Sequence, residues 1–528
     1  MTTEGTRREP DHALQVRVWW DLLVGSQRHT AATESQGKPV EVAAIQFHGC
    51  SPSGRRNLDW VKIVLVCRRL LRKRTLVRGE AVNLFDSNCT GESMALKHGM
   101  DTKKSKTARV SRPERFQVEM QLFSLDQMLP ADHRARVVWK FVESLDLEPL
   151  YQCIEVSDDK AGRTAIAPEI LVAVWLLATL DGVGAARELD RRCKEQIPYL
   201  WLLGGVSVNY HTLSDFRVGR AEFLEQLLVD TVTALIDRDL VPLETIAQDG
   251  MRVRANAGKS SFRRKPTLEK LQAAAKAHVD RLKKEAENES ACQQGDARRR
   301  AAARRAAQER QTRIDEALAQ HEKLAEQREQ RKKGEGEKTR VSTTDPDARN
   351  MKMANGGFDP AFNVQFATDA DTRIIVAVEV SNAGTDGGEL DPMLKKVASD
   401  YGKTPAMALV DSAYATKDGV TKAEKDGTKV VSSVPRSEQL EKHGKDPHSR
   451  QKRDTDQYAA FRSRMADEKY QELYKMRPSI AEFPNAVCRN RNLRQFPVRG
   501  LIKAKAVALW HALAFNFSRM LNLEILAT

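Results

Sequence analysis

The chain has 528 residues, enough for three or four domains of about 150 residues each. Hydrophobic residues make up 41% and charged residues 30%, which supplies a sizeable core and excludes wholesale disorder and a collagen-like structure. No run of 18 apolar residues occurs, so the sequence predicts no membrane partner. The 86 Lys and Arg residues exceed the 72 Asp and Glu residues by 14, which favours a polyanionic partner such as nucleic acid.

The seven cysteines are scattered, and no two of them form a CxxC pair. This spacing argues against a disulfide scaffold and against a cysteine-built zinc site. We therefore expect a protein of the reducing cytoplasm.

Residues 1–111 differ from the rest of the chain in composition. Arg and Lys runs alternate there with Ser, Gly and Thr stretches, and only Trp60 to Leu71 has the composition of a regular element. A basic DNA-contacting arm is one interpretation. We favour a poorly ordered extension, which a misplaced start would explain, with later starts at Met94, Met100 and Met120.

Residues 112–239 have the pattern of a helical domain. Apolar residues recur at helical spacing from Ala131 to Leu145, and further helices are expected from Pro168 to Leu180, Ala185 to Cys193 and Tyr199 to Leu203. A last helix is expected to open at Thr212 as its cap and to run through Phe223 to Ile236. The series is compatible with a helix-turn-helix DNA-binding domain and equally with a simple helical bundle.

From Leu240 the pattern changes to short strands. Leu243 to Ala247, Met251 to Arg254, Phe362 to Ala367, Ile374 to Val380, Met407 to Val410 and Gly427 to Val434 are predicted strands. Gly356-Gly357 and Asp369 to Thr372 are the expected hairpin turns. Helices are expected again at Tyr458 to Tyr474 and Ile502 to Leu526, with a charged loop at Arg436 to Asp456.

An insertion at about residues 265–340 interrupts the strands. Its centre, Arg298 to Lys338, contains 13 Lys or Arg and 8 Asp or Glu, and its leucines are too sparse for a heptad seam. The pattern predicts a long helical hairpin, for which we favour solvated faces over DNA binding.

Motifs for nucleotide hydrolysis, zinc proteolysis and serine hydrolysis are absent, because neither a Walker loop nor GxGxxG, HExxH or GxSxG occurs. What remains is a set of carboxylates beside predicted strands. Asp249 follows an apolar strand, and so does Asp411. Two such carboxylates on neighbouring strands can bind Mg²⁺, and two ions about 4 Å apart can promote phosphodiester displacement. By contrast, Asp369, Asp371, Asp386 and Asp391 are interpreted as turn formers and caps.

Several blocks together resemble the DDE-type transposases of bacterial insertion sequences, the subgroup with an RNase H-like catalytic core. The blocks are Ile166 to Trp175 with Asp181 to Gly184, Gly204 to Arg217, Gln248 to Arg264, Met351 to Ala367, Val410 to Tyr414, Tyr474-x2-Arg477-x4-Glu482-x6-Arg489 and Val498 to Asn516. Each block alone is weak, but their order makes the resemblance specific, and it extends from Arg112 to the end of the chain.

The resemblance implies a fold and a set of site residues. The fold is α+β and multidomain, with a helix-turn-helix-like domain at 112–239 and an RNase H-like mixed-sheet core at 240–528 that carries the helical insertion. Asp249, Asp411 and Glu482 become the catalytic and metal-binding carboxylates, converging on Mg²⁺ with Mn²⁺ as a substitute. Tyr474, Arg477 and Arg489 are expected to position the DNA backbone or the glutamate.

Further basic and polar residues are expected to contact DNA. His211, Thr212 and Arg217 are assigned to the element ends, and Arg252, Arg254, Lys259 and Arg263 to phosphates near the active site. Two features depart from the family pattern. Arg489 stands where Lys is usual, and Pro478 and Pro484 flank Glu482, where Pro484 is expected to disturb the helix.

The function that follows is cleavage at the ends of an insertion sequence and transfer of the 3′ ends into target DNA. The partners are double-stranded DNA and a second copy of the chain, as a homodimer or larger assembly, in the bacterial cytoplasm at the nucleoid. A catalytically inactive DNA-binding remnant or regulator is the alternative. A long-helix structural protein is a third interpretation, against which the strands and carboxylates argue.

Overall fold

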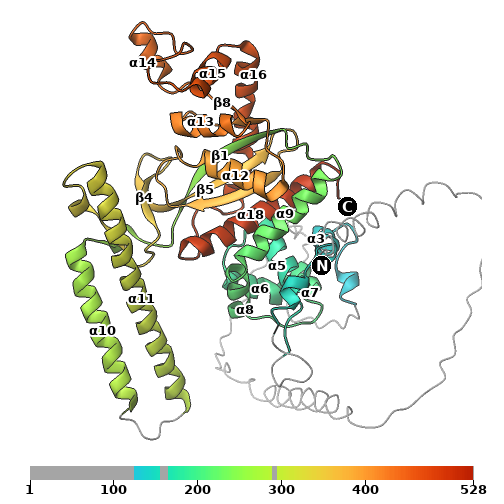
Figure 1. Cartoon of the computed structure of the whole chain (residues 1–528). Coiled ribbons are helices and arrows are strands. Elements are labelled where there is room, and N and C mark those ends of the chain that lie inside the picture. The colour runs from blue at the N-terminus through green and yellow to red at the C-terminus, as the bar shows by residue number, and fades with distance from the viewer. Residues whose placement is uncertain (1–123, 155–163, 288–293, 527–528) are drawn as a thin grey trace, which may run out of the picture. The chain divides into compact units, whose positions relative to one another are not determined.

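The computed structural model describes residues 124–154, 164–287 and 294–526 (Figure 1). The expected element at Trp60 to Leu71 and the expected boundary at Arg112 lie outside these residues. The described residues all belong to one compact unit. No helix in these ranges is long and apolar enough to cross a membrane.

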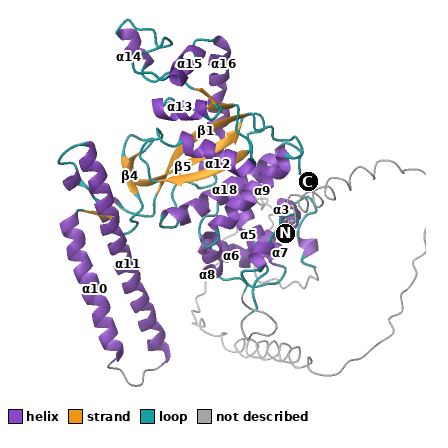
Figure 2. Cartoon of the chain, in the orientation of Figure 1, coloured by secondary structure: helices purple, strands orange, loops and turns teal. Residues whose placement is uncertain are grey.

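The first part of this unit is helical (Figure 2). Its elements are η1 (Asp126–Met128), α3 (Arg134–Glu143), α4 (Glu148–Tyr151), α5 (Pro168–Leu180), α6 (Ala186–Glu195), α7 (Ile197–Leu203), α8 (Tyr210–Val218) and α9 (Ala221–Ile236). The expected helices are present at their predicted places. Helix α5 is buried on nearly all sides, as its continuous apolar run predicts.

The end of this helical region differs from the expectation in two details. Asn209, not Thr212, is the cap of α8, because its side-chain oxygen accepts the N–H groups of His211 and Thr212 at 2.9 and 3.0 Å. The single helix expected through Ile236 is divided at Gly219, where α8 ends before α9 begins.

A mixed sheet follows, with the order β4-β5-β1-β7-β8 and with β6 also paired to β5. The strands are β1 (Thr245–Arg254), β4 (Arg349–Lys352), β5 (Phe358–Asp369), β6 (Ile375–Ser381), β7 (Met407–Leu409) and β8 (Lys429–Val431). Strand β5 runs antiparallel to β1, β4 and β6, whereas β7 is parallel to both β1 and β8. The two predicted hairpin turns and four of the six predicted strands are present. The strands expected at Leu243 to Ala247 and Met251 to Arg254 form the single strand β1, and β4 was not expected.

The insertion forms two long helices joined to a small ribbon. They are η2 (Lys259–Ser261), β2 (Phe262–Arg263), α10 (Lys265–Glu287), α11 (Gln294–Arg331), η3 (Gly336–Lys338) and β3 (Val341–Ser342). Helices α10 and α11 lie side by side (Figure 1). Leu268, Ala317 and Val341 form a small separate core at the base of the pair, so the predicted helical hairpin is confirmed.

The remaining helices complete the unit. They are α12 (Leu390–Tyr401), α13 (Lys417–Lys425), α14 (Ser437–Lys442), α15 (Asp456–Arg464), α16 (Glu468–Arg477), η4 (Pro478–Glu482), α17 (Phe483–Asn490) and α18 (Leu501–Asn522). The helix expected from Tyr458 to Tyr474 is divided into α15 and α16, and the expected charged loop contains α14. Helix α18 packs against α5 and α9 as well as β6, so the helical region and the sheet share one core.

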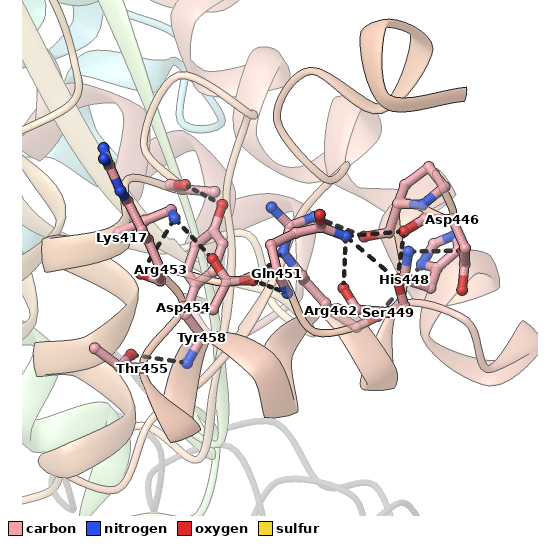
Figure 3. Close-up of polar contacts among 12 residues, drawn as sticks. Lys417, Asp446, His448, Ser449, Gln451, Arg453, Asp454, Thr455, Tyr458 and Arg462 are labelled. Atoms are coloured by element: carbon pink, nitrogen blue, oxygen red, sulfur yellow. Dashed lines mark hydrogen bonds and ion pairs between the residues drawn. The ribbon is translucent and has the colours of Figure 1, made fainter. Parts of the chain in front are cut away.

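A polar network fixes the segment between α14 and α15 (Figure 3). The side chain of Asp454 is fully covered and pairs with Arg462 at 2.8 Å and with Lys417 at 2.8 Å. Its Oδ2 also accepts the backbone N–H of Gln451. Arg462 in turn donates to the carbonyl of Pro447. The charged loop is thereby tied to α15 by the buried Asp454–Arg462 pair and to α13 by the more exposed Lys417.

Candidate active site

Asp249 lies in the middle of β1, not at the end of a strand as expected. Strand β1 continues for five residues beyond it to Arg254, because β5 pairs with the whole length of β1. Only the first residues of β1 pair with β7. Asp249 therefore lies beyond the part of β1 that pairs with β7.

Asp411 is aligned with Asp249 by the register of the two strands. The pairing of β1 with β7 matches Thr245 to Met407 and Ala247 to Leu409, and the same offset of 162 residues separates Asp249 from Asp411. Neighbouring strands lie about 4.8 Å apart, and equivalent positions point to the same face of a sheet. The chain leaves β7 just before Asp411, which is half-buried.

Glu482 is the last residue of a π-helical turn, η4, that separates α16 from α17. This turn packs against β1 and β5, and π-turns inside helices occur frequently at functional sites. The helical run from Glu468 to Asn490 is interrupted by this π-turn directly before Pro484, as expected. Pro484 itself stands in the first turn of α17, where proline is tolerated.

Arg477 joins two of the three carboxylates. Its Nη1 lies 3.9 Å from Oδ1 of Asp249, and its Nη2 donates to Oε1 of Glu482 at 3.2 Å. The Arg477 side chain is 10% exposed, whereas that of Glu482 is 56% exposed. The Tyr474 ring lies 6.0 Å from the guanidinium carbon of Arg477, and its hydroxyl donates to Ser433.

Burial raises the pKa of Asp249 to about 6. The positive charge of Arg477, the backbone N–H of Gly250 and the side-chain amide of Asn485 act in the opposite direction, and the negative charge of Glu482 adds to the rise. Asn485 donates to Oδ2 of Asp249 at 2.8 Å. An ionised Asp249 therefore gains more from an added cation than an exposed carboxylate does.

The donor chemistry of these three residues suits a hard divalent cation, which prefers carboxylate oxygens. As placed, however, the described part of the chain contains no group of three His, Cys, Asp or Glu side chains close enough to hold a metal ion. Glu482 does not join such a group because its side chain contacts Arg477. Its exposed side chain has room to leave that contact, whereas Asp249 is held by the strand.

A second polar network lies beside Asp249 and was not expected. Asp386, assigned to turn formation, accepts hydrogen bonds from Asn363 and Gln365 on β5 and pairs with Arg252 at 3.0 Å. The buried Tyr414 hydroxyl donates to Gln365 at 2.6 Å. Gly250 leaves the necessary space, since a Cβ there would stand 2.4 Å from Gln365 and 2.9 Å from Tyr414.

Two family models match the chain. Residues 123–219 match the Transposase domain (DUF772), and residues 335–517 match the Transposase DDE domain. The chain belongs to the DDE transposases of insertion sequences. No curated protein and no solved structure matches it. The first matched region covers the helical part from η1 to α8, and the second covers the sheet from β4 onward together with Asp411, Arg477 and Glu482.

One residue assigned to DNA in this transposase occupies a different kind of position. Arg217 is buried, its guanidinium carbon lies 5.0 Å from the centre of the Trp175 ring, and it donates to the carbonyl of Gly184. Burial lowers its pKa to about 10. Arg217 therefore stabilises the packing of α8, and its assignment to DNA contact is corrected. His211 on the same helix is exposed, and Thr212 is half-buried.

The other basic residues expected near the active site lie on or near β1 and α17. Arg254, Lys259, Arg263 and Arg489 are exposed. Lys259 pairs with Asp359 at 3.0 Å. Arg252 is half-buried and is engaged by Asp386, so it is less available to a phosphate than the others.

The sequence interpretation missed Asn485, which contacts the first catalytic candidate. Asn485 stands three residues after Glu482, on the same side of a helical turn, and this spacing could have indicated it. The Gln365–Tyr414 contact had no comparable indication, because its two residues are 49 positions apart.

Proposed function

We propose that this transposase cleaves the ends of an insertion sequence and transfers the freed 3′ ends into target DNA. Both steps are phosphodiester displacements that depend on Mg²⁺, with Mn²⁺ as a substitute. The protein acts on double-stranded DNA as a homodimer or larger assembly, because two ends must be joined. Its place of action is the bacterial cytoplasm, at the nucleoid.

The observation that supports this proposal most is the position of Arg477, which contacts both Asp249 and Glu482 beside the sheet. Asp249 and Asp411 each stand two residues beyond the last pair of β1 with β7, Ala247 and Leu409. The order β6-β5-β1-β7-β8, with β5 antiparallel to β1, supports an RNase H-like core. Asp249, Asp411 and Glu482 would hold the metal, which when bound steadies the attacking and leaving oxygens.

The residues of the chain have separate tasks in this proposal. Glu482 would help to hold the metal by leaving its contact with Arg477. Arg477 is then free to grip a phosphate, and among the described residues its Nε and Nη1 have no hydrogen-bond acceptor. Arg489 supplies a further charge on the exposed side of α17. Tyr474 orients Arg477 from its place one turn earlier on α16.

DNA recognition is assigned to two surfaces. His211 and Thr212, on the exposed side of α8, contact the element ends. Arg254, Lys259 and Arg263 hold phosphates near the active site, with Arg252 in a supporting place. Phosphate contacts of this kind fix the position of the duplex. They also make the affinity of the protein for DNA depend on salt concentration.

The test is cleavage in vitro of duplex DNA that carries the inverted repeats flanking the gene, with Mg²⁺ or Mn²⁺. The wild-type chain is expected to nick at the repeat ends. Asp249→Asn, Asp411→Asn and Glu482→Gln are each expected to reduce the rate by at least about 10²-fold, while the exposed Asp237→Asn on the far end of α9 serves as the control. Binding without cleavage by the wild type would instead identify a catalytically inactive remnant.

A further inference from the structure

The distal half of the helical hairpin carries a concentration of positive charge that the active site does not use. Described residues 280–286 of α10 and 297–307 of α11 contain eight Lys or Arg side chains and two acidic ones. The cations are Arg281, Lys283, Lys284, Arg298, Arg299, Arg300, Arg304 and Arg305. We call this set the distal cationic patch.

The two helices bring the patch together. Gln272 of α10 donates to Asp315 of α11 at 2.7 Å, and this antiparallel match places residues near 283 beside residues near 304. Val279 is buried on α10, and Ala307 and Ile314 are buried on α11. The apolar contacts therefore lie between the helices, and the cations of both helices are left on the outside.

Charge on the hairpin is segregated along its length. Residues 308–331 of α11, nearer the sheet, contain five Lys or Arg and six Asp or Glu. A solvated helix needs mixed charge for solubility but gains nothing from collecting one sign at one end. Within the described part of the chain, Arg298, Arg299, Arg304 and Arg305 are exposed and make no ion pair or hydrogen bond.

Helix stability accounts for only part of the patch. Arg281, Lys283 and Lys284 lie near the C-terminal end of α10, where the helix dipole favours positive charge. The dipole gives no such gain to Arg298, Arg299, Arg304 and Arg305 near the start of α11. Arg300 and Arg304 are also like charges at i and i+4, a spacing that destabilises a helix. The alanines between the arginines have high helix propensity, so the helical hairpin forms despite the unfavourable charge.

We propose that the distal cationic patch binds the phosphate backbone of duplex DNA beyond the active site, as a clamp on flanking or target DNA. The proposal rests on the proposed function, which supplies the duplex. Ala317, at the base of the helical hairpin, and Arg298 are 19 residues apart, or about 28 Å along a helix. That reach corresponds to about eight base pairs at 3.4 Å each. Arginine suits the task because its guanidinium binds phosphate bidentately.

The test compares two full-length variants of equal charge. The distal variant carries Arg298→Gln, Arg299→Gln, Arg304→Gln and Arg305→Gln. The control variant carries Arg310→Gln, Lys323→Gln, Arg328→Gln and Arg331→Gln, four exposed positions on the same helix nearer the sheet. Binding to a 40-base-pair random-sequence duplex is measured between 50 and 300 mM salt, and helicity is checked by circular dichroism.

The distal variant is expected to bind more weakly and with a shallower salt dependence. The slope of log affinity against log salt changes by about 0.9 for each phosphate that the protein no longer neutralises, so two such phosphates weaken binding roughly 60-fold at 0.1 M salt. The control variant should stay within a few-fold of the wild type. The double variants Arg298→Gln/Arg299→Gln and Arg304→Gln/Arg305→Gln should each give part of the effect, which guards against a folding defect of the fourfold change.

The outcomes separate the two proposals. Equal binding by the distal and control variants, with wild-type DNA binding and end cleavage intact, would overturn the clamp and leave the proposed function standing. Failure of the wild type to bind the random-sequence duplex at 0.1 M salt, with end binding and cleavage intact, would also overturn the clamp alone, whereas failure to bind or cleave end-containing duplex would overturn the proposed function on which the clamp rests. Weaker binding of the distal variant to single-stranded RNA of equal length but not to duplex DNA would assign the patch to a different nucleic acid and also overturn the proposal.

Discussion

At the scale of single residues, Asp249 combines a buried position with a negative charge. Burial raises its pKa from 3.8 to about 6, so the folded state binds the proton more tightly than the unfolded state does. Its ionisation therefore destabilises the fold as pH rises from about 4 to about 6, and the full cost remains above that range. A site of this kind keeps a carboxylate ready for a cation at neutral pH.

The first prediction follows from the destabilising effect of Asp249 ionisation. Asp249→Asn should raise the free energy of unfolding at pH 8, by at most about 3 kcal/mol, and should change it less at pH 4. Urea unfolding in the presence of EDTA at both pH values measures the difference. Asp237→Asn gives the baseline for removing one exposed carboxylate. If Asp249→Asn raised the free energy of unfolding equally at both pH values, burial would not be raising the pKa of Asp249.

Arg477 leads to the second prediction. Its positive charge lowers the pKa of Asp249 against the effect of burial, so Arg477→Gln should move the acid limb of the pH–rate profile for end cleavage to higher pH. Arg477→Lys keeps the charge and should leave the limb nearer its wild-type position, although an ammonium group cannot bridge Asp249 and Glu482 as a guanidinium does. Identical profiles for the two variants would exclude an electrostatic role for Arg477.

At the scale of elements, the segment around Asp454 shows how a charged loop is held in place. Burial alone would raise the pKa of Asp454, but Lys417, the Gln451 N–H and Arg462 outweigh it and lower the pKa. The stabilisation is therefore present above the unfolded pKa and is lost as pH falls through the lower folded value. A proton on Asp454 would leave Arg462 buried without its partner.

The third prediction concerns this network (Figure 3). Asp454→Ala should destabilise the chain by roughly 3 kcal/mol at pH 7, because it leaves the buried Arg462 uncompensated. The exposed Arg450–Asp456 pair provides the matched control, since Asp456→Ala should cost less than about 1 kcal/mol. Urea unfolding measures both, and limited proteolysis should show earlier cleavage within residues 443–453 of the Asp454 variant. Equal destabilisation by the two variants would count against this account.

The π-turn at Pro478–Glu482 is a second element with a specific consequence. It separates α16 from α17, with Pro484 in the first turn of α17. Asn485 and Arg477 thereby reach Asp249 from two sides of the turn. Regular α-helical geometry with the same sequence would rotate these side chains relative to each other.

At the scale of the whole molecule, α18 joins the helical region to the sheet. It packs on α5, α9 and β6, and Lys505 on α18 pairs with Glu225 on α9 and with Glu379 on β6. Lys396 of α12 joins the same group through Glu225. Because these contacts bury α18 on both sides, the two matched regions depend on each other for stability.

The fourth prediction concerns the N-terminal part of the chain. A chain beginning at Met120 keeps both regions that match transposase domains and all of the core that the structure describes. It should therefore unfold at the same temperature as the full chain, within about 2 °C, and bind duplex DNA with similar affinity. Chains beginning at Met94 and Met100 serve as controls for the exact boundary. Loss of folding in all three would show that residues 1–119 contribute to the core.

The sequence by itself determined the kinds of elements, their order and the candidate carboxylates. Helical periodicity, Val- and Ile-rich runs and turn residues are local patterns, so α5, β5, β6 and the hairpin of α10 and α11 could be predicted from neighbouring residues. Asp249 and Asp411 are candidates as carboxylates beside predicted strands, and the resemblance of the surrounding sequence to a family adds Glu482. The register of β1 with β7 could not be read from the sequence around Asp249 or from the sequence around Asp411 alone.

Only the tertiary structure decided which polar residues face solvent and which face each other. Arg217 looked like a surface cation on an exposed helix, but Trp175 and Gly184, 42 and 33 positions away, bury it. Asp249 appeared to end a strand until its pairing with β5 extended β1 to Arg254. The physical reason is the same in both cases, since burial and strand pairing depend on residues distant in the chain, whereas propensity and periodicity depend on residues nearby.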